Sequence, residues 1–369
     1  TAFGGAWALV FLFFVGLGFR DTLQTRHSVL RNYPLIGHLR FLLEFVRPEI
    51  RQYFIEGDRE SMPFSRQQRS LVYQRSKGQQ DKRPFGTQLD VHQQGFEWIN
   101  HSIAPTILAG HDFRITIGGE RCTQPYSASV FNISAMSFGA LSANAILALN
   151  EGAKRGGFAH DTGEGSISVH HRVKGGDLIW EIGSGYFGCR NDDGTFNAEK
   201  FAENARDAQV KMIELKLSQG AKPGHGGVLP GAKVTPEIAA ARGVPVGVDC
   251  ISPSRHSAFD TPLEMLAFIA HLRELSGGKP VGFKLCIGHP WEWFALAKAM
   301  RESDQLPDFI VIDGAEGGTG AAPLEFTDHV GAPLQEGLLL VHNTLVGLNL
   351  RHRIKLGCAG KVISAFDIA

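Results

Sequence analysis

A repeated alternation of short apolar segments with longer helical segments constrains the fold of this chain most. From residue 130 onward, runs rich in β-branched residues end in glycine or small polar residues, and helical stretches follow them. The pattern predicts seven strands, at residues 130–134, 157–160, 210–217, 246–251, 281–286, 309–312 and 354–356. Helices are predicted between them, at residues 144–155, 262–275, 291–301 and 334–350. Strands that alternate with helices at this spacing form parallel β/α units.

The length of this region fits a (β/α)8 TIM barrel. Residues 131–369 number 239, against ~250 for a complete barrel. We therefore expect residues 127–369 to hold about seven of the eight units, with the chain ending inside the helix after the seventh strand. In a barrel of this kind the functional site lies at the carboxyl ends of the strands.

The first residues of the chain differ in composition from all that follow. Residues 2–19 contain no charged or polar side chain, and ~20 such residues cross a bilayer as a helix. Residues 1–20 are therefore predicted to be a transmembrane helix; a core helix buried on every side is the alternative. A signal peptide would carry its positive charges in front of the apolar segment. Here the positive charges follow it, at Arg20, Arg26, Arg31 and Arg40.

This charge distribution predicts a single-pass membrane protein with the barrel on the cytoplasmic side. Residues 21–126 are predicted to form an α-rich connector and N-terminal extension. Within it, residues 27–60 are amphipathic, which suits either the membrane surface or packing on the main domain.

The overall composition excludes several classes of partner and site. Lysine and arginine number 37, as do aspartate and glutamate, and no basic tail is present, so nucleic acid is not expected as a partner. The five cysteines are at least 36 residues apart, which provides no zinc or redox pair. His170 and His171 are predicted on opposite faces of a β segment, which makes them a surface pair that cannot bind one metal together. No metal site is predicted.

Glycine is the residue type in clear excess. The 44 glycines are about 12% of the chain, against a usual ~7%. Many lie in four segments that follow predicted strands, at residues 135–139, 161–165, 219–227 and 313–320. Because glycine has no Cβ, such loops can bring backbone N–H groups against a ligand. We expect the four loops to converge on one cavity.

The residues of these loops carry a family resemblance. The relevant motifs are SAMSFGALS (134–142), DTGEGS (161–166), EIGSGYFG (181–188), ELKLSQGAKPGHGGVLPGAKV (214–234), GVDCISP (247–253), FKL (283–285) and DGAEGGTGAAP (313–323). With these motifs the chain resembles the FMN-binding synthase domain of glutamate synthases, in a stand-alone, membrane-anchored type. The resemblance implies a flavin barrel that reduces 2-iminoglutarate, or the imine of a related 2-oxo acid, to an amino acid by hydride transfer from flavin N5 in glutamate biosynthesis.

The resemblance also implies which residues bind FMN. The backbone amides of Ala135, Met136 and Ser137 would meet the N5 edge of the isoalloxazine, and Lys284 would lie at its N1/O2 edge. A cation there stabilises the anionic reduced flavin; a salt bridge in the barrel interior is the alternative role for Lys284. The other implied FMN contacts are Gly317, Gly318, Thr319 and Gly320, with Gly360 near the phosphate.

The implied oxo-acid site consists of Glu164, Lys216, Gln219, Lys222 and Arg242, with Glu164 and Lys284 as the catalytic residues. Cations and an amide suit a dicarboxylate. Structural alternatives are a helix cap for Arg242, and for Lys216 a pair with Glu214 or another barrel residue. Two residues depart from the family pattern, because His225 replaces an acidic residue and Val228 replaces a glutamine. These departures put 2-oxoglutarate itself in doubt as the substrate.

Other functional interpretations remain open. No glutaminase cysteine precedes the barrel, so the imine would form from free ammonia or an amine, or be delivered by a separate subunit. This leaves an N-alkylglutamate synthase or dehydrogenase as an alternative, and a flavin-free, membrane-anchored assembly subunit as another. No GxGxxG fingerprint for NAD(P)H is present, so a reductase subunit or a ferredoxin is the expected electron donor. An iron–sulfur cluster would need ligands beyond residue 369.

Overall fold

The computed structural model describes residues 2–55, 57, 62–80, 85–317 and 322–369. Its contacts divide into two compact units, residues 1–100 with 363–369 and residues 101–362. Three of the residues implied in FMN binding lie outside the described part of the chain, namely Gly318, Thr319 and Gly320.

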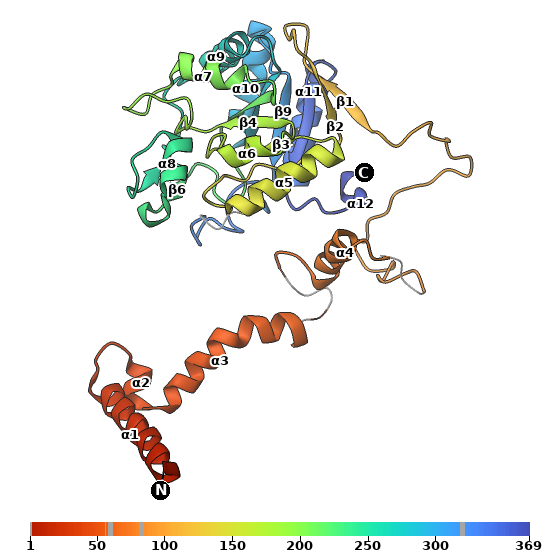
Figure 1. The fold of residues 1–369 in the computed structure, drawn as a ribbon. Coiled ribbons are helices and arrows are strands. Elements are labelled where there is room, and N and C mark those ends of the chain that lie inside the picture. The colour runs from red at the N-terminus through yellow and green to blue at the C-terminus, as the bar shows by residue number, and fades with distance from the viewer. Residues whose placement is uncertain (1, 56, 58–61, 81–84, 318–321) are drawn as a thin grey trace. The chain divides into compact units, whose positions relative to one another are not determined.

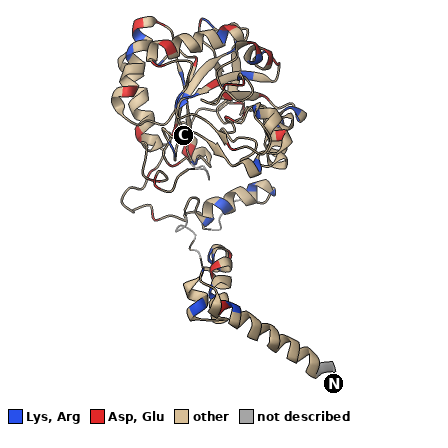
Figure 2. Cartoon of the chain, turned by 90° about the vertical axis from the view of Figure 1, so that its left-hand side faces the viewer, with Lys and Arg blue, Asp and Glu red and all other residues tan. Residues whose placement is uncertain are grey.

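The first unit is helical. It contains α1 (Ala2–Leu23), α2 (Ser28–Asn32), α3 (Ile36–Ile50), a π-helical turn η1 (Arg51–Ile55), α4 (Arg66–Ser76) and α12 (Ala365–Ile368). Within α1, Gly4–Leu23 is long and apolar enough to cross a membrane, and only 6% of its most apolar stretch is buried. The expected alternative of a core helix covered on every side therefore does not describe α1. Figure 2 shows that charged residues appear only at the end of this helix.

A buried carboxylate fixes the turn between α1 and α3. The side chain of Asp21 accepts a hydrogen bond from the backbone N–H of Leu35 at 3.2 Å, and its Oδ2 lies 2.8 Å from Nε2 of His38. Asp21 is 1% exposed although it follows a run of exposed apolar residues. These contacts connect the end of α1 to the start of α3.

The second unit is built on one curved parallel sheet. Its strands are β3 (His160–Asp161), β4 (Leu178–Ile182), β5 (Val210–Lys216), β8 (Val281–Leu285), β9 (Phe309–Asp313) and β10 (Lys355–Ala359). The strands lie in the order β10-β9-β8-β5-β4-β3, and every neighbouring pair is parallel. Beside β3, Ile133 forms an isolated parallel bridge with His160. The sheet is a curved half-barrel of parallel β/α units, which confirms the predicted fold class (Figure 1).

The identity of two strands differs from the prediction. Strand β4 was not predicted, because Glu181 interrupts its apolar run. The segment at 246–251 was predicted as a barrel strand, which is wrong. Its only described strand, β7 (Cys250–Ile251), pairs antiparallel with β6 (Val228–Leu229) outside the barrel. Its apolar side chains are largely exposed, Ile251 at 62%, so this segment is apolar without being buried on both faces.

Helices pack around the sheet (Figure 1). They are α5 (Ala143–Gly156), α6 (Val169–Val173), α7 (Ala198–Ala205), α9 (Pro262–Leu275), α10 (Pro290–Ser303) and α11 (Leu334–Gly347). The helix α8 (Pro236–Arg242) and the 3-10 turn η2 (Gly231–Lys233) lie beside β6, away from the sheet. The four helices predicted from the sequence are α5, α9, α10 and α11. A side-chain cap from Ser142 starts α5, and a capping box between Thr261 and Glu264 starts α9. Trp180 and Trp293 belong to the large core between sheet and helices.

A hairpin packs at the amino end of the sheet. Strands β1 (Arg114–Ile117) and β2 (Tyr126–Ser129) are antiparallel, and the buried face of β2 packs on residues near the starts of several barrel strands. This cluster contains Tyr126, Ala128, Ala159, Ile179, Met212 and Phe309. The hairpin therefore covers the end opposite the glycine-rich loops, which leaves the carboxyl ends of the strands for a site.

Candidate active site

Glu164 occupies a space that two glycines provide. It lies in the loop after β3, and its carboxylate fits against the loops after β4 and β5. A Cβ on Gly227 would lie 2.3 Å from Oε1 of Glu164, and one on Gly183 would lie 2.9 Å from Oε2. Any larger residue at either position would displace this carboxylate.

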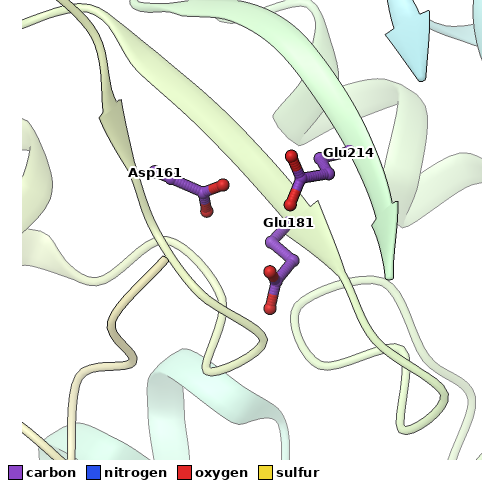
Figure 3. Close-up of side chains that lie close together, drawn as sticks. All are labelled: Asp161, Glu181 and Glu214. Carbon is purple, nitrogen blue, oxygen red and sulfur yellow. The ribbon is translucent and has the colours of Figure 1, made fainter. Parts of the chain in front are cut away.

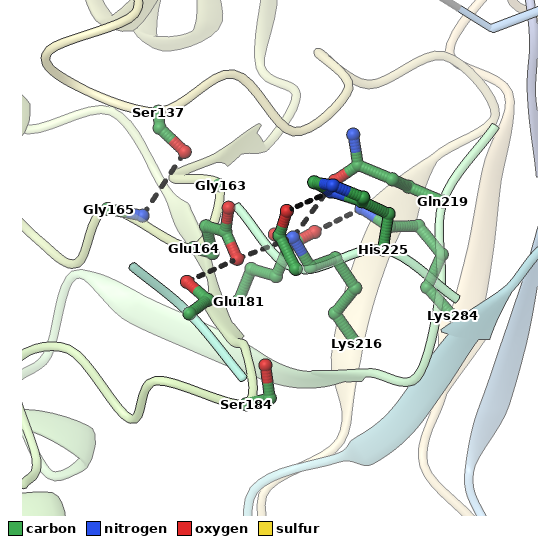
Figure 4. A network of polar contacts seen from close by, with 12 residues as sticks. Ser137, Gly163, Glu164, Gly165, Glu181, Ser184, Lys216, Gln219, His225 and Lys284 are labelled. Carbon is green, nitrogen blue, oxygen red and sulfur yellow. Dashed lines mark hydrogen bonds and ion pairs between the residues drawn. The ribbon is translucent and has the colours of Figure 1, made fainter. Parts of the chain in front are cut away.

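The structure brings Glu164, Lys216 and Gln219 together (Figure 4). Nζ of Lys216, at the end of β5, lies 2.8 Å from Oε2 of Glu164 and donates a hydrogen bond of 2.9 Å to Oε1 of Gln219. Ser252 adds a hydroxyl 3.4 Å from Oε2 of Glu164. The three side chains border a small hollow that Ser184 and Pro253 also line. Three of the five residues implied in oxo-acid binding therefore form one polar group.

The charge state of this group follows from its surroundings. Burial opposes ionisation of Glu164, but the positive charges of Lys216, Lys222 and Arg242 outweigh it and hold the pKa of Glu164 at about 2. Burial likewise opposes the charge on Lys216, but Glu164 and Glu181 raise its pKa above the ordinary value. The site therefore presents a stable ion pair at neutral pH.

Lys222 and Arg242 are in different situations. Lys222 is 4% exposed, and its ammonium has no hydrogen-bond or ion-pair partner among the residues that the structure describes. Burial lowers its pKa, although the Glu164 charge acts in the opposite direction. A buried lysine without a partner, whose charge acts on Glu164, is suited to receive a ligand carboxylate.

The guanidinium of Arg242 contacts other groups of the protein. Its Nη2 donates to the carbonyl oxygen of Phe138 at 3.1 Å, and its Nη1 lies 3.6 Å from Sγ of Cys250. Its guanidinium also lies over the ring of Phe187. Arg242 thus joins the strand-one loop to β7 and does not line the hollow. It is not the helix cap either, since Gly243 ends α8 in the left-handed conformation.

Lys284 lies inside the barrel among carboxyl groups. Its Nζ contacts Oε2 of Glu181 and lies 3.0 Å from Oε1 of Glu214. Three carboxyl groups, those of Asp161, Glu181 and Glu214, have oxygens within 4.8 Å of one another (Figure 3). Burial disfavours a charged lysine, but the surrounding carboxylates raise the pKa of Lys284 well above its usual value. The interior salt bridge weighed for Lys284 is thus present, and its contact with FMN stays a prediction.

Strand geometry explains this convergence. Side chains alternate across a strand, so Glu214 and Lys216 share one face of β5. The register of the sheet sets Glu181 of β4 beside Glu214, and Lys284 of β8 beside Lys216. Sequence reasoning did not select Glu181, Glu214, Asp161 or Asp313 as site residues. The signal for them was an acidic residue within or at the end of an otherwise apolar strand.

The strand-one loop has features that fit a flavin. Ala135, Met136 and Ser137 are partly buried, and their backbone N–H groups have no hydrogen-bond partner among the described residues. Ser137 accepts a hydrogen bond of 3.2 Å from the N–H of Gly165 through its hydroxyl, which fixes the loop. Gly360, after β10, has φ +145° and only ordinary contacts around the position of a Cβ. Free donors at one strand end and an open glycine at another match what FMN requires.

The glycine-rich loops also pack tightly on one another. A Cβ on Gly220 would lie 2.0 Å from the carbonyl oxygen of Gly314, and one on Gly226 would lie 1.8 Å from that of Ser252. The glycines were expected to admit a ligand. At these two positions, the lack of a Cβ instead allows neighbouring loops to approach each other closely.

The two positions that depart from the implied family pattern differ in location. His225 lines the hollow together with Glu164 and packs its ring edge-on against Phe326, 5.8 Å between centroids. Val228 lies in β6, opposite Ile251, and is half-exposed. His170 and His171 were predicted on a β segment, which is wrong, since they lie in α6 and His171 is fully buried.

Comparisons with known proteins point to one family. A family profile described as the conserved region in glutamate synthase matches residues 110–369. The glutamate synthase large subunit-like protein YerD of Bacillus subtilis is 37% identical over 406 residues, which cover 99% of this chain and 77% of that protein. The archaeal-type glutamate synthase (NADPH) of Thermotoga maritima is 37% identical over 236 residues, which cover 64% of this chain and 43% of that protein. The chain therefore spans less than half the length of that enzyme.

Among solved structures, a mutant flavocytochrome b2 with benzoylformate aligns over 69% of this chain and 59% of that chain. The identity is 11% and the TM-score is 0.39. A likeness at this level carries no argument about ligand or reaction.

Proposed function

Because the chain belongs to the glutamate synthase family, we propose that it is an FMN-dependent oxidoreductase that reduces the imine of a 2-oxo acid to an amino acid. The observation that carries the substrate class is the group of Glu164, Lys216 and Gln219 next to the unpaired ammonium of Lys222. A fixed ion pair, an amide and a free buried cation suit a ligand with a carboxylate at one end and hydrogen-bonding groups at the other.

Each residue has a definite role in this proposal. Lys222 binds a substrate carboxylate, and Gln219 orients the substrate through its amide. Glu164 remains ionised because its pKa is about 2, so it accepts hydrogen bonds from the imine N–H and holds the C=N bond in place. Lys216 neutralises Glu164 and donates to the substrate. His225, which stands where the implied family pattern has an acidic residue, lines this hollow. We propose that His225 influences which oxo acid is accepted.

The free amides of Ala135, Met136 and Ser137 would hold the reactive edge of the flavin, and Gly360 would lie near its phosphate. FMN, when bound, supplies the hydride for the imine carbon. Lys284 lies beside Lys216 in the barrel interior, and we propose that it acts on the N1/O2 edge.

The proposal also includes an electron donor, a nitrogen source and a location in the cell. A reductase subunit or a ferredoxin supplies the electrons, and free ammonia or an amine supplies the nitrogen. The segment Gly4–Leu23 has the length and composition of a single membrane span. We propose that it anchors the barrel on the cytoplasmic side, next to its electron donor.

The reoxidation of reduced flavin tests this function. The purified full-length protein is reduced anaerobically and mixed with 2-oxo acids, with and without ammonium or methylamine. We expect fast reoxidation only when both the oxo acid and the amine are present. Equal rates with and without them would reject imine reduction. A protein without flavin absorption, from which denaturation releases no FMN, would support the alternative of a flavin-free assembly subunit.

A further inference from the structure

The barrel interior contains more acidic than basic groups. Glu181 and Glu214 are each 2% exposed, and Asp161 is 4% exposed. Among the described residues, Lys284 pairs with Glu181 and Glu214, and Lys216 pairs more distantly with Glu181. Asp313, on β9, adds a fourth carboxylate whose Oδ2 accepts from the N–H of Gly220 at 2.9 Å. Several unpaired carboxylates cannot all stay ionised in a buried space, because desolvation and mutual repulsion are too costly.

The surplus charge is relieved by protonation. Burial, together with the charge of Glu181 and against the effect of Lys284, raises the pKa of Glu214 to about 7. Burial and the charges of Glu214 and Glu181 raise the pKa of Asp161 well above its ordinary value. Asp313 shifts in the same direction, chiefly through burial. The close packing of the three carboxyl groups and the raised pKa values of Glu214 and Asp161 both favour a proton held within the trio.

A series of ion pairs joins the trio to the hollow. Glu214 lies 3.0 Å from Lys284, and Lys284 contacts Glu181. Oε1 of Glu181 lies 3.6 Å from Nζ of Lys216. Lys216 in turn lies 2.8 Å from Glu164, whose carboxylate lines the hollow. Acidic and basic groups alternate along this path, and Figure 4 labels its members from Lys284 to Glu164.

We propose that Asp161 and Glu214 form an internal proton reservoir, from which Lys284, Glu181 and Lys216 pass a proton to the nitrogen of the bound imine. This inference rests on the proposed function. The C=N π bond breaks, the carbon gains a hydride whose electron pair comes from the reduced flavin, and the nitrogen gains the proton. Each relay group receives a proton as it gives one up, so only the reservoir changes its charge. Solvent later restores the reservoir's proton.

Infrared spectroscopy of the full-length flavoprotein tests the reservoir without turnover. We expect a protonated-carboxyl band at pH 7 that shifts in D2O and disappears as the pH rises. Glu214→Gln and Asp161→Asn should each reduce this band, whereas Glu292→Gln, an exposed position on α10, should leave it unchanged. A wild-type protein without such a band at pH 7 would overturn the proposal.

The transfer step is tested by kinetics on the same variants. We expect Glu214→Gln to lower kcat for imine reduction by about 100-fold, with unchanged flavin content and little change in KM. The wild-type kcat should fall as the pH rises through about 7, and the variant should lose this dependence. Variants that keep the wild-type kcat and pH profile would overturn the relay. A wild-type flavin that no imine reoxidises, in a protein that shows the band, would instead overturn the proposed function and its transfer step.

Discussion

At the scale of single residues, the charge on each site lysine depends on its partners. Lys216 and Lys284 are both paired with carboxylates, whereas Lys222 has no partner in the described part of the chain. The carboxylate partners of a paired lysine stabilise its charge in the folded protein. A buried lysine without such a partner suggests a role in binding a ligand. The sequence marks all three as lysines near strand ends but does not distinguish them, since pairing depends on which strands are neighbours.

Lys222 gives the first prediction. Lys222→Met should weaken oxo-acid binding about 10- to 100-fold, because one charge-assisted hydrogen bond contributes about 1.5–3 kcal/mol. It should not lower the free energy of unfolding, because no partner is left unpaired. Flavin-monitored titration and chemical denaturation measure the two effects. Lys233→Met, at an exposed position in η2, is the control and should change neither. A destabilised Lys222→Met variant with unchanged binding would contradict the assignment.

The buried histidine pair gives a second prediction. Burial lowers the pKa of His160 to about 4 and that of His171 to about 3, and both ring nitrogens of His160 lack partners in the described structure. Both pKa values lie below the unfolded value of ~6.5, so the unfolded state takes up protons first. Stability from these groups is complete above pH ~6.5 and is lost as the pH falls toward 4.

His160→Leu should therefore be more acid-resistant than the wild type. As the pH falls from 6.5 to 4, the free energy of unfolding of the wild type should decrease relative to that of the variant by about 1.4 kcal/mol for each pH unit. Urea denaturation at pH 7, 6 and 5 measures it, with His352→Leu at an exposed position as the control. A difference that is independent of pH would show that His160 is not held neutral by burial.

At the scale of elements, the order of strands was predictable only in part. Apolar runs at β5, β8 and β9 were long enough to identify each strand, and the capping residues marked α5 and α9. Strand β4 was missed because Glu181 interrupts its apolar run. The opposite error arose at 246–251, where an apolar run lies in an exposed ribbon. Register, and with it the alignment of Glu181 with Glu214, is a property of the folded sheet.

The contact between the loops after β5 and β9 gives a third prediction. Gly220→Ala should destabilise the protein by about 1–3 kcal/mol or more, because the new Cβ would overlap the carbonyl oxygen of Gly314. It should also reduce FMN retention, since both loops border the site. Gly288→Ala is the matched control, with no heavy atom within 4 Å of its Cβ. Thermal unfolding and flavin content measure the effect, and equal behaviour of the two variants would contradict this packing.

At the scale of the whole molecule, the sequence identified a barrel, an apolar first helix and a family, and the fold and the comparisons confirm the barrel and the family. The candidate oxo-acid site was predictable from motifs for Glu164, Lys216 and Gln219. The location of Arg242 was not, because its partners Phe138 and Cys250 come from distant segments.

The first helix gives a fourth prediction. The full-length protein should stay with membranes after an alkaline carbonate wash, because Gly4–Leu23 is long and apolar enough to span a bilayer. Leu12→Arg with Phe13→Arg should release it, since each arginine at the centre of a span costs about 2.5–3.5 kcal/mol. Leu324→Arg, at an exposed barrel position, is the control. A wild-type protein recovered in the wash would exclude the anchor.

The central claim is the formation of an amino acid at the expense of the reduced flavin. Its most direct test is a single anaerobic turnover with a 2-oxo acid and nitrogen-15-labelled ammonium, followed by mass spectrometry. The account predicts one labelled amino acid for each flavin oxidised, and almost none with Lys222→Met at low oxo-acid concentration. Oxidation of the flavin without labelled amino acid would contradict it.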